Sequence, residues 1–450
     1  MFDLEFNKSK LNQQQLLDIE KKFHQNLALD MSLKSNVLSL NRTDLYAHAL
    51  SLFVRSNVHK VLDLSVSQLL DFLIDVADKY TEAPYHTFYH AVDIVTILYY
   101  LCHDLNADMY LTDLDKSILM VAALCHDIGH PGFTNCFQIN TKTELAEKYG
   151  GKSTLETYSV YLTMELLNKH NTANSHVVRD TIKDLILSTD MAYHSELVKQ
   201  ADQLSHFIEQ SKKSSSNKRK HSTSTALMPP PTNLDPKSRT SLCRILLHAA
   251  DISNMARPWV ISKQWSDLIV QEFFSQGDEE RKRKMTISPG MDREVCSQSS
   301  ISLKFGQLIL PYFESLVSLL PKSHVFVDFL LANRTQWERL DQHKQPPVST
   351  IRRVSSDIRA TSTTVTTTTT PAPTIATAAT AIKYKRIRLG FRSKSFPTVL
   401  YHHHQHHHYQ SNVIIEKNNL LPLVHFKSSL LYDTVKTNIE SIVLYHPYDQ

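Results

Sequence analysis

Glycine is scarce in this chain, at 8 of 450 residues, and alternating runs rich in valine, isoleucine and threonine are missing before position 343. Both absences argue against a β-sheet. Leucines recur instead at spacings of three and four, which is the period of one face of a helix. We therefore predict an all-α fold class, with many helices in a compact domain.

Cysteine pairs of the CxxC type and long apolar runs are also missing. The five cysteines are scattered, and we expect them to stay reduced in an intracellular, cytoplasmic protein. The residues after Met1 are acidic and lack the apolar core of a signal peptide. The apolar run from Ala91 to Cys102 is too short and too polar to span a bilayer, so no membrane partner is expected.

A strong excess of one charge is missing as well, because the formal net charge is only +4. Bulk electrostatics therefore gives no argument for nucleic acid as a partner, and protein partners stay open. A basic run lies among serines at 212–220. We interpret this run as a solvated loop, and the alternative is a nuclear-import signal or a phosphorylation site.

Composition also suggests how the chain is divided. Residues 1–40 read as a lead-in, with a frayed end followed by a polar helix after Asn12, and residues 41–342 read as one helical domain. Within this domain, 203–238 is rich in lysine, serine and proline, and we predict a disordered insertion. Residues 343–450 contain a threonine run and a histidine tract, which predicts a low-complexity, disordered tail.

The most informative motif is His126 followed by Asp127, which ends an apolar helical run and enters a Pro-Gly turn. An imidazole and a carboxylate at the mouth of a core can form a corner for metal ions. Imidazole suits a zinc-like ion, and a carboxylate can bridge to a harder ion such as magnesium. The alternative is a helix end with a structurally satisfied histidine.

Two further pairs strengthen the metal interpretation. His86 and His90 are four residues apart, and His248 and Asp251 are three apart, so each pair is expected on one face of a helix. All three pairs lie in apolar stretches, where a bare charge would be costly. Jointly they indicate a metal site built from distant parts of the chain.

The longest motif, HDIGHPGFTN at 126–135, resembles the signature of the class I 3',5'-cyclic nucleotide phosphodiesterases. The resemblance covers about 40–342 and identifies this stretch as a phosphodiesterase catalytic domain of the HD type. Supporting matches are Tyr85-His86 with His90, QIN at 138–140 with TEL at 143–145, TDM at 189–191, HAADISN at 248–254, and QGD at 276–278 ahead of Ser288-Pro289 and Met291-Asp292.

The resemblance implies an all-helical fold and hydrolysis of cyclic AMP or cyclic GMP, or both, to 5'-nucleoside monophosphates. It implies two divalent metal ions as cofactors, with Zn²⁺ at a tight site and Mg²⁺ or Mn²⁺ at a second site. By the same resemblance, His86 is the general acid, and Asn254 lines the nucleotide pocket. The implied metal ligands are His90, His126, Asp127 and Asp251, and His130 and Glu156 match positions that support them.

General chemistry agrees with these roles. Two metal ions can supply a nucleophile at neutral pH and clamp the phosphate. The departing ribose oxygen still needs a proton, and an imidazole beside the metal ligands can donate one because its pKa lies near the working pH. His86, close to His90 in the sequence, is expected to do this.

The chain also departs from the family pattern. Gly129 stands where a second aspartate is frequent, Thr87 follows the general acid in place of asparagine, and Tyr158 replaces a histidine. Counting back from Pro311 does not reach the glutamine that clamps the purine base. Gln298 and Phe305 are therefore the candidates for binding the base.

Two alternatives remain from the sequence alone. One is a phosphohydrolase that uses the same metal corner on another nucleotide, and the other is a weakly active or inactive protein that binds cyclic nucleotides or acts as a scaffold. The altered base clamp favours the second, whereas the complete set of expected metal ligands favours an active enzyme.

Overall fold

A computed structural model describes residues 2–219 and 234–342 of the chain, with side chains for 2–211 and 234–342. The described parts are helical and contain no strand, which confirms the predicted all-α class. The α-helices are α1 (Gln13–Asn26), α2 (Arg42–Arg55), α3 (Val58–Val61), α4 (Val66–Ala77), α5 (Phe88–His103), α6 (Asp113–Cys125), α7 (Asn135–Asn140), α8 (Glu144–Tyr149), α9 (Thr154–Lys169), α10 (His176–Leu187), α11 (His194–Arg219), α12 (Pro236–Asp251), α13 (Trp259–Lys282), α14 (Gln298–Leu319) and α15 (His324–Gln342). Short 3₁₀ turns lie at Val37–Ser39, Ala107–Tyr110, Met191–Tyr193, Ile252–Ala256 and Pro321–Ser323.

Side-chain caps begin several of these helices. Thr112, a threonine just before the apolar run that ends at Cys125 and therefore a predicted helix cap, accepts a hydrogen bond from the backbone N–H of Asp115. The Asp115 carboxylate in turn accepts a hydrogen bond from the Thr112 N–H. This reciprocal arrangement satisfies two N–H groups that a helix start otherwise leaves without partners. Asn12 caps α1 in the same way together with Gln15. Local sequence signals therefore place these two helix starts correctly.

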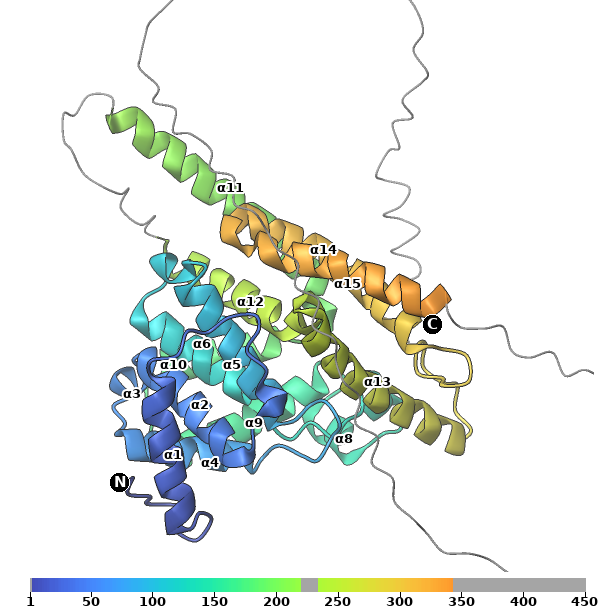
Figure 1. Cartoon of the computed structure of the whole chain (residues 1–450), viewed down its shortest axis with the longest axis horizontal. Coiled ribbons are helices and arrows are strands. Elements are labelled where there is room, and N and C mark those ends of the chain that lie inside the picture. Colours follow the sequence, from blue (N-terminus) through green and yellow to red (C-terminus); the bar gives the residue numbers. More distant parts are fainter. Residues whose placement is uncertain (1, 220–233, 343–450) are drawn as a thin grey trace, which may run out of the picture. The chain divides into compact units, whose positions relative to one another are not determined.

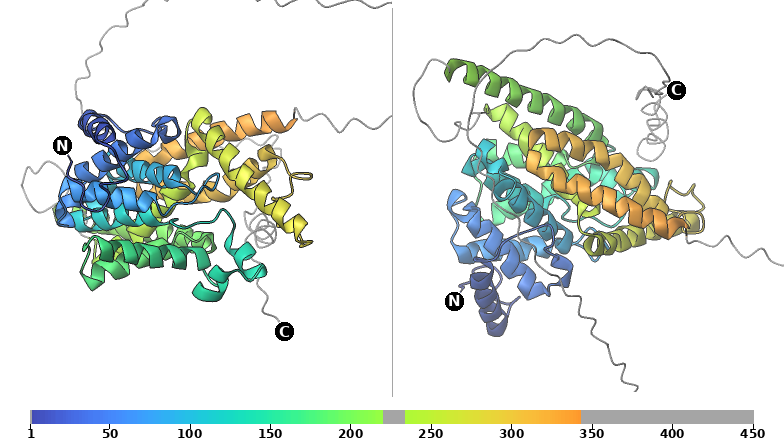
Figure 2. Two further views of the ribbon diagram at one scale, coloured as in Figure 1. Left: turned by 90° about the horizontal axis from the view of Figure 1, so that it is seen from below. Right: turned by 45° about the horizontal axis from the view of Figure 1, so that its top comes forward.

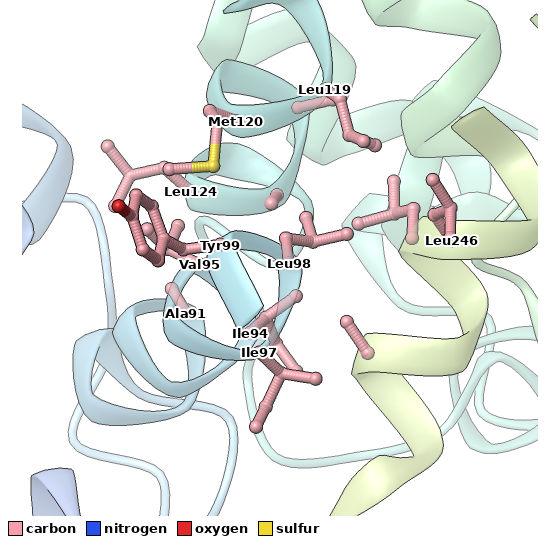
Figure 3. Close-up of a cluster of buried hydrophobic side chains, with 14 of the residues drawn as sticks. Ala91, Ile94, Val95, Ile97, Leu98, Tyr99, Leu119, Met120, Leu124 and Leu246 are labelled. Carbon is pink, nitrogen blue, oxygen red and sulfur yellow. The ribbon is translucent and has the colours of Figure 1, made fainter. Parts of the chain in front are cut away.

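The core is centred on α5, which is buried along nearly its whole length. Its apolar side chains meet those of α6 and α12, and Figure 3 shows Leu98 between Leu119 of α6 and Leu246 of α12. Because α5 is enclosed on most sides, its first turn and the ends of α6 and α12 are held in a fixed relation. On another side of the domain, α14 packs against both α11 and α15, and the three run side by side (Figures 1 and 2).

Three predicted boundaries are wrong. α11 continues to Arg219 because residues such as Leu204 and Ile208 bury apolar surface in the core, so 203–219 is helical rather than a disordered insertion. α12 likewise begins at Pro236, inside the predicted insertion. The charged residues at 277–284 also predict a turn in the sequence, but most of them form the last part of α13.

The N-terminal end is also better ordered than predicted. Residues 3–10 lie along α4 and donate hydrogen bonds to it, so the expectation of a frayed end is wrong. Residues 220–233 and the tail at 343–450 lie outside the described residues. Among the described helices, none is both long enough and apolar enough to cross a membrane.

A buried ion pair ties the lead-in to the core. The Arg257 guanidinium lies 3.0 Å from the Asp93 carboxylate of α5, and both side chains are almost inaccessible to solvent. Arg257 also donates hydrogen bonds to the backbone carbonyls of Leu33 and Ser35. The charges of Arg257 and Asp93 are therefore paired with each other and with backbone carbonyls inside the protein.

We expect Asp93→Ala to lower the free energy of unfolding by about 3–5 kcal/mol, because it leaves the Arg257 charge buried without its partner. Urea denaturation followed by circular dichroism measures this loss. Lys263→Ala is the matched control, since it removes a partly exposed ion pair with Asp267 within one helix, where about 0.3–0.5 kcal/mol is typical. Similar losses in the two variants would contradict the prediction.

Candidate metal centre

Two imidazoles and two carboxylates meet at the ends of three helices. His90 lies in the first turn of α5, His126 and Asp127 end α6, and Asp251 ends α12. The Nε2 atom of His90 lies 3.1 Å from Asp251 Oδ1 and 3.6 Å from Asp127 Oδ2. The Nε2 atom of His126 lies 2.9 Å from Asp127 Oδ2 and 3.5 Å from Asp251 Oδ1. The structure thus brings together the four residues expected as metal ligands.

The ring of His126 is held in an orientation that suits a metal ligand. Its Nδ1 atom lies 2.8 Å from the Ala123 carbonyl oxygen, to which it donates a hydrogen bond. Its Nε2 atom is buried and has no hydrogen-bond partner, although it faces the two carboxylates. A backbone acceptor on one ring nitrogen is the usual way in which a ligating histidine is oriented.

The two carboxylates of this corner favour a positive charge between them. Burial works against charge on His126, yet the carboxylates of Asp127 and Asp251 outweigh it and raise the pKa of this imidazole well above its ordinary value. A divalent ion would satisfy the same two carboxylates and leave the imidazole neutral, as a ligand must be. The donor set, two imidazole nitrogens and carboxylate oxygens, is one that zinc-like ions accept.

The third predicted pair separates in the structure. His248 does not face the metal corner with Asp251, because its Nε2 atom lies 2.9 Å from Nδ1 of His194. The two rings pack against Tyr312 in the core. His248 is therefore a core residue, and the end of α12 offers Asp251 alone to the site.

His86 lies beside the corner but not on α5. The helix begins at Phe88, so His86 belongs to the segment before it, and the prediction that both histidines share a helix is wrong. The His86 Nδ1 atom lies 2.5 Å from Oε1 of Glu272, a residue of α13. The other carboxylate oxygen of Glu272 accepts backbone hydrogen bonds from Tyr85 and His86.

Glu272 is a functional candidate that sequence analysis missed. Burial would lower the pKa of His86, but the adjacent Glu272 carboxylate outweighs it and raises that pKa to about 9. His86 and Glu272 therefore form an ion pair at neutral pH, with the second ring nitrogen of His86 still available to a substrate. Glu272 is separated from His86 by 186 residues and lies in no recognised motif, so spacing gave no signal.

His130 stacks on His86, with ring centroids 3.8 Å apart. Burial and the neighbouring positive His86 lower the pKa of His130 to about 3, so its ring is neutral. Its Nδ1 atom accepts a hydrogen bond from the Gly132 N–H, and its backbone carbonyl accepts one from Thr81. His130 thus packs behind the candidate acid and fixes the turn after Asp127.

Glu156, expected to support the site, lies at the start of α9. Its carboxylate accepts hydrogen bonds from the side-chain amide of Asn135 at 2.9 and 3.2 Å. Burial, together with the nearby Asp190 carboxylate, raises the pKa of Glu156 to about 8. Glu156 therefore joins α7 to α9 next to the site and does not contact the four corner residues.

The three candidates for nucleotide binding lie in different environments. Asn254 is buried, and its amide donates to the hydroxyl of Tyr85, next to His86. Gln298 is the first residue of α14, and its amide donates to Ser266 at 3.0 Å and Asp267 at 2.7 Å. Phe305 is partly buried against the core. The Gln298 amide nitrogen is thus engaged by α13.

Gly129 and Tyr158, two of the departures from the family pattern, are in contact. Gly129 has φ of +80°, and a Cβ atom there would lie 2.6 Å from Cε1 of Tyr158 and 2.7 Å from Cδ1 of Leu162. Tyr158 and Leu162 come from α9, which also donates a hydrogen bond from Ser159 to the Ile128 carbonyl. α9 therefore supports the turn at 127–130, and Tyr158 and Leu162 leave no room for a Cβ atom at position 129.

We expect Gly129→Ala to destabilise the chain more than Gly150→Ala. Gly150 also has positive φ, +89°, but no atom lies within 4 Å of the Cβ position there. At either position the positive φ strains an alanine by about 1–3 kcal/mol, and only Gly129→Ala adds a clash. Urea denaturation measures both losses. The variant Gly129→Ala/Tyr158→Ala should recover part of the extra loss, and strictly additive losses would show that the two residues are not coupled.

Comparisons with known proteins agree with this geometry. The model of the family described as 3'5'-cyclic nucleotide phosphodiesterase matches residues 85–330, more than half of the chain. A high affinity cGMP-specific 3',5'-cyclic phosphodiesterase 9A from Drosophila melanogaster is 32% identical over 60% of this chain and 17% of its own length. A cGMP-specific 3',5'-cGMP phosphodiesterase 3 from Dictyostelium discoideum is 29% identical over 66% of this chain and 61% of its own length.

Among solved structures, the phosphodiesterase domain of Salpingoeca rosetta rhodopsin phosphodiesterase superposes with a TM-score of 0.61 at 25% identity. The match covers 71% of this chain and 94% of that domain. The chain spans less than two thirds of the length of the two curated relatives. The family match covers α5 to α14 and the early part of α15, and with them every residue of the metal corner. The chain therefore belongs to the 3'5'-cyclic nucleotide phosphodiesterase family.

Proposed function

We propose that this chain hydrolyses 3',5'-cyclic nucleotides to 5'-nucleoside monophosphates and so ends cyclic-nucleotide signals. The observation that supports this most is the meeting of His90, His126, Asp127 and Asp251 from three helices, with His86 beside them. The family match supports the same reaction class. Residues 41–342 would form the catalytic domain.

The four corner residues would hold Zn²⁺ at the tight site. Asp127 would also reach a second ion, Mg²⁺ or Mn²⁺, with water as most of its other ligands. When bound, the two ions activate water and neutralise charge on the phosphoryl oxygens. The supporting observation is that His90, His126 and Asp127 offer ligand atoms within 4.8 Å of one another. His130 and Glu156 would hold the surrounding turns.

His86 would act as the general acid. The oxygen of a water molecule bonds to phosphorus and one proton of that water passes to solvent, while the bond from phosphorus to the ribose 3' oxygen breaks. A proton from His86 goes to the 3' oxygen, and His86 then regains a proton from solvent. Glu272 occupies the Nδ1 side of the ring, so the proton would leave from Nε2. Glu272 is a positioning residue in this scheme, because it contacts His86 rather than the substrate.

Asn254 would line the nucleotide pocket through its link to Tyr85. Phe305 and Gln298 would face the base, although Gln298 must first leave Ser266 and Asp267. Two of the curated relatives are named as cGMP-specific, so cyclic GMP is the first substrate to test. The five unpaired cysteines are consistent with a cytoplasmic location.

The direct test is hydrolysis of cyclic GMP and cyclic AMP by the purified chain. We expect release of the 5'-monophosphate, loss of turnover with a chelator, and recovery when Zn²⁺ and Mg²⁺ are added back. Isothermal calorimetry with cyclic GMP provides a second readout. Binding without turnover in the presence of both metals would overturn the proposal.

That outcome would favour the second candidate function, a protein that binds cyclic nucleotides without hydrolysing them. The observation in its favour is that the Gln298 amide is already held by α13. Turnover of a different phosphorylated nucleotide, with neither cyclic nucleotide hydrolysed, would indicate a phosphohydrolase of another specificity.

A further inference from the structure

Residues 3–10, which we name the N-terminal strap, lie in a specific site on α4. The centre of this site is Asp71, whose carboxylate is completely buried. Its oxygens accept hydrogen bonds from the backbone N–H of Glu5 at 2.6 Å and of Asn7 at 3.0 Å. The Asn7 side-chain amide donates to the same carboxylate at 2.7 Å and to the Asp71 carbonyl at 2.8 Å.

Asp71 thus accepts hydrogen bonds from the backbone and the asparagine amide of the strap rather than pairing with a basic side chain. A charged carboxylate that accepts several N–H groups makes stronger hydrogen bonds than a neutral acceptor. Burying this charge without such partners would be costly. Asp71 lies among buried apolar residues of α4, so its buried charge is stabilised only when a peptide donates hydrogen bonds to it.

The site continues one helical turn further along α4. Lys10 lies 2.9 Å from the Asp75 carboxylate, which also contacts Lys169 and His170 at the end of α9. The ring of Phe6 stacks edge-on against His170, with centroids 4.9 Å apart. The peptide is therefore recognised by its successive N–H groups, one asparagine, one aromatic ring and one lysine.

The far end of the same helix connects to the metal corner. Lys79, just after α4, accepts a hydrogen bond from the Gly129 N–H at 2.9 Å through its carbonyl oxygen. The Tyr80 hydroxyl donates to the Leu124 carbonyl at 2.9 Å. Gly129 lies in the turn at 127–130, and Leu124 lies at the end of α6 just before that turn. A shift of α4 would therefore move the backbone that carries a proposed metal ligand.

We propose that the α4 surface around Asp71 and Asp75 is a peptide-binding site, with the N-terminal strap as its resident ligand. Occupancy of this site holds the turn at 127–130 in place. Release of the strap from the site loosens the turn. Hydrogen exchange and peptide binding can be measured without catalytic activity, so failure of this proposal is distinguishable from failure of the proposed function.

The first experiment uses the full chain and the substitution Asn7→Asp, which places a second carboxylate against Asp71. Hydrogen exchange followed by mass spectrometry reports the amides of residues 5–7 and of Gly129. We expect exchange at 5–7 to accelerate by about tenfold or more, the scale expected when hydrogen bonds to a charged group are lost, and exchange at Gly129 to accelerate with it.

Asn12→Ala is the matched control. It removes the cap of α1 but no contact with α4, so it should leave exchange at Gly129 unchanged. Fast exchange at 5–7 together with unchanged protection of Gly129 in Asn7→Asp would overturn the coupling. Acceleration at Gly129 in the control as well would show general destabilisation instead, and this too would count against the proposal.

The second experiment tests the site itself. A fluorescent peptide with the sequence of residues 2–11 is added to the full chain that carries Asn7→Asp, whose own strap is weakened, and binding is measured by fluorescence anisotropy. We expect saturable binding to this variant and at least about tenfold weaker binding to the parent chain, whose site is filled by its own strap. The matched peptide with Asn7→Asp should bind at least about tenfold more weakly as well. Equal binding of both peptides, or equal binding to both chains, would overturn the proposal.

Discussion

Asp251→Ala is expected to abolish hydrolysis of cyclic nucleotides and to empty the tight metal site. Asp251 contributes a carboxylate that lies 3.1 Å from His90 and 3.5 Å from His126, so both imidazoles lose one of the two carboxylates that they share. Loss of an outer-shell partner already lowers metal affinity by about 10–100-fold, and loss of a direct ligand should exceed that. Metal content by mass spectrometry and turnover on cyclic GMP measure the two effects.

Asp184→Ala provides the control for this prediction. Asp184 of α10 pairs with Arg244 of α12 near the surface, so its removal disturbs the same helix without touching the corner. We expect this variant to retain metal and turnover. An Asp251→Ala protein that keeps its zinc and turns over within tenfold of the parent would show that the corner is not the metal site.

His86→Ala is expected to reduce turnover by about 10²–10⁴-fold, the usual contribution of a general acid, while metal content stays near that of the parent. The reason is that His86 contacts Glu272 and His130 rather than completing the corner. His103→Ala, at the opposite end of α5, is the matched control and should retain turnover. Metal loss as large as in Asp251→Ala would show that His86 is a ligand and not the acid.

The pH dependence of turnover provides a second test of the same role. Burial disfavours a charged His86, but Glu272 outweighs it and raises the pKa of His86 above its ordinary value. A general acid works in its protonated form, so turnover should fall as the pH rises through this raised pKa. In Glu272→Gln the fall should begin at lower pH, and in His86→Ala the fall due to this group should be absent. Identical alkaline profiles in parent and Glu272→Gln would contradict the assignment.

The parts of the fold that sequence could predict are those set by local signals. Thr112 followed by Asp115 places the start of α6, and the apolar run before His126 places its end. The meeting of these residues was also predictable, because His90, His126 and Asp251 each interrupt a buried apolar stretch, where a polar group without a partner would be costly. These signals need only a few neighbouring residues to be recognised.

What could not be predicted depends on contacts between distant residues. The partner of His86 lies on another helix, and the ring of His248 turned to His194 rather than towards Asp251. The order of the N-terminal strap was missed for the same reason, since its few apolar residues give no periodic pattern. A usable signal did exist, because Asp71 and Asp75 are charged residues on the buried, largely apolar face of α4.

Glu272 binds both the ring of His86 and the backbone amides that carry it. One carboxylate therefore fixes the position of the proposed acid, His86, and also raises its pKa. These two properties cannot be adjusted separately by changing residue 272. A relative in which the corresponding histidine has a different pKa would need a change at another contact of that imidazole. The ring of His130, which packs against His86, is the available neighbour.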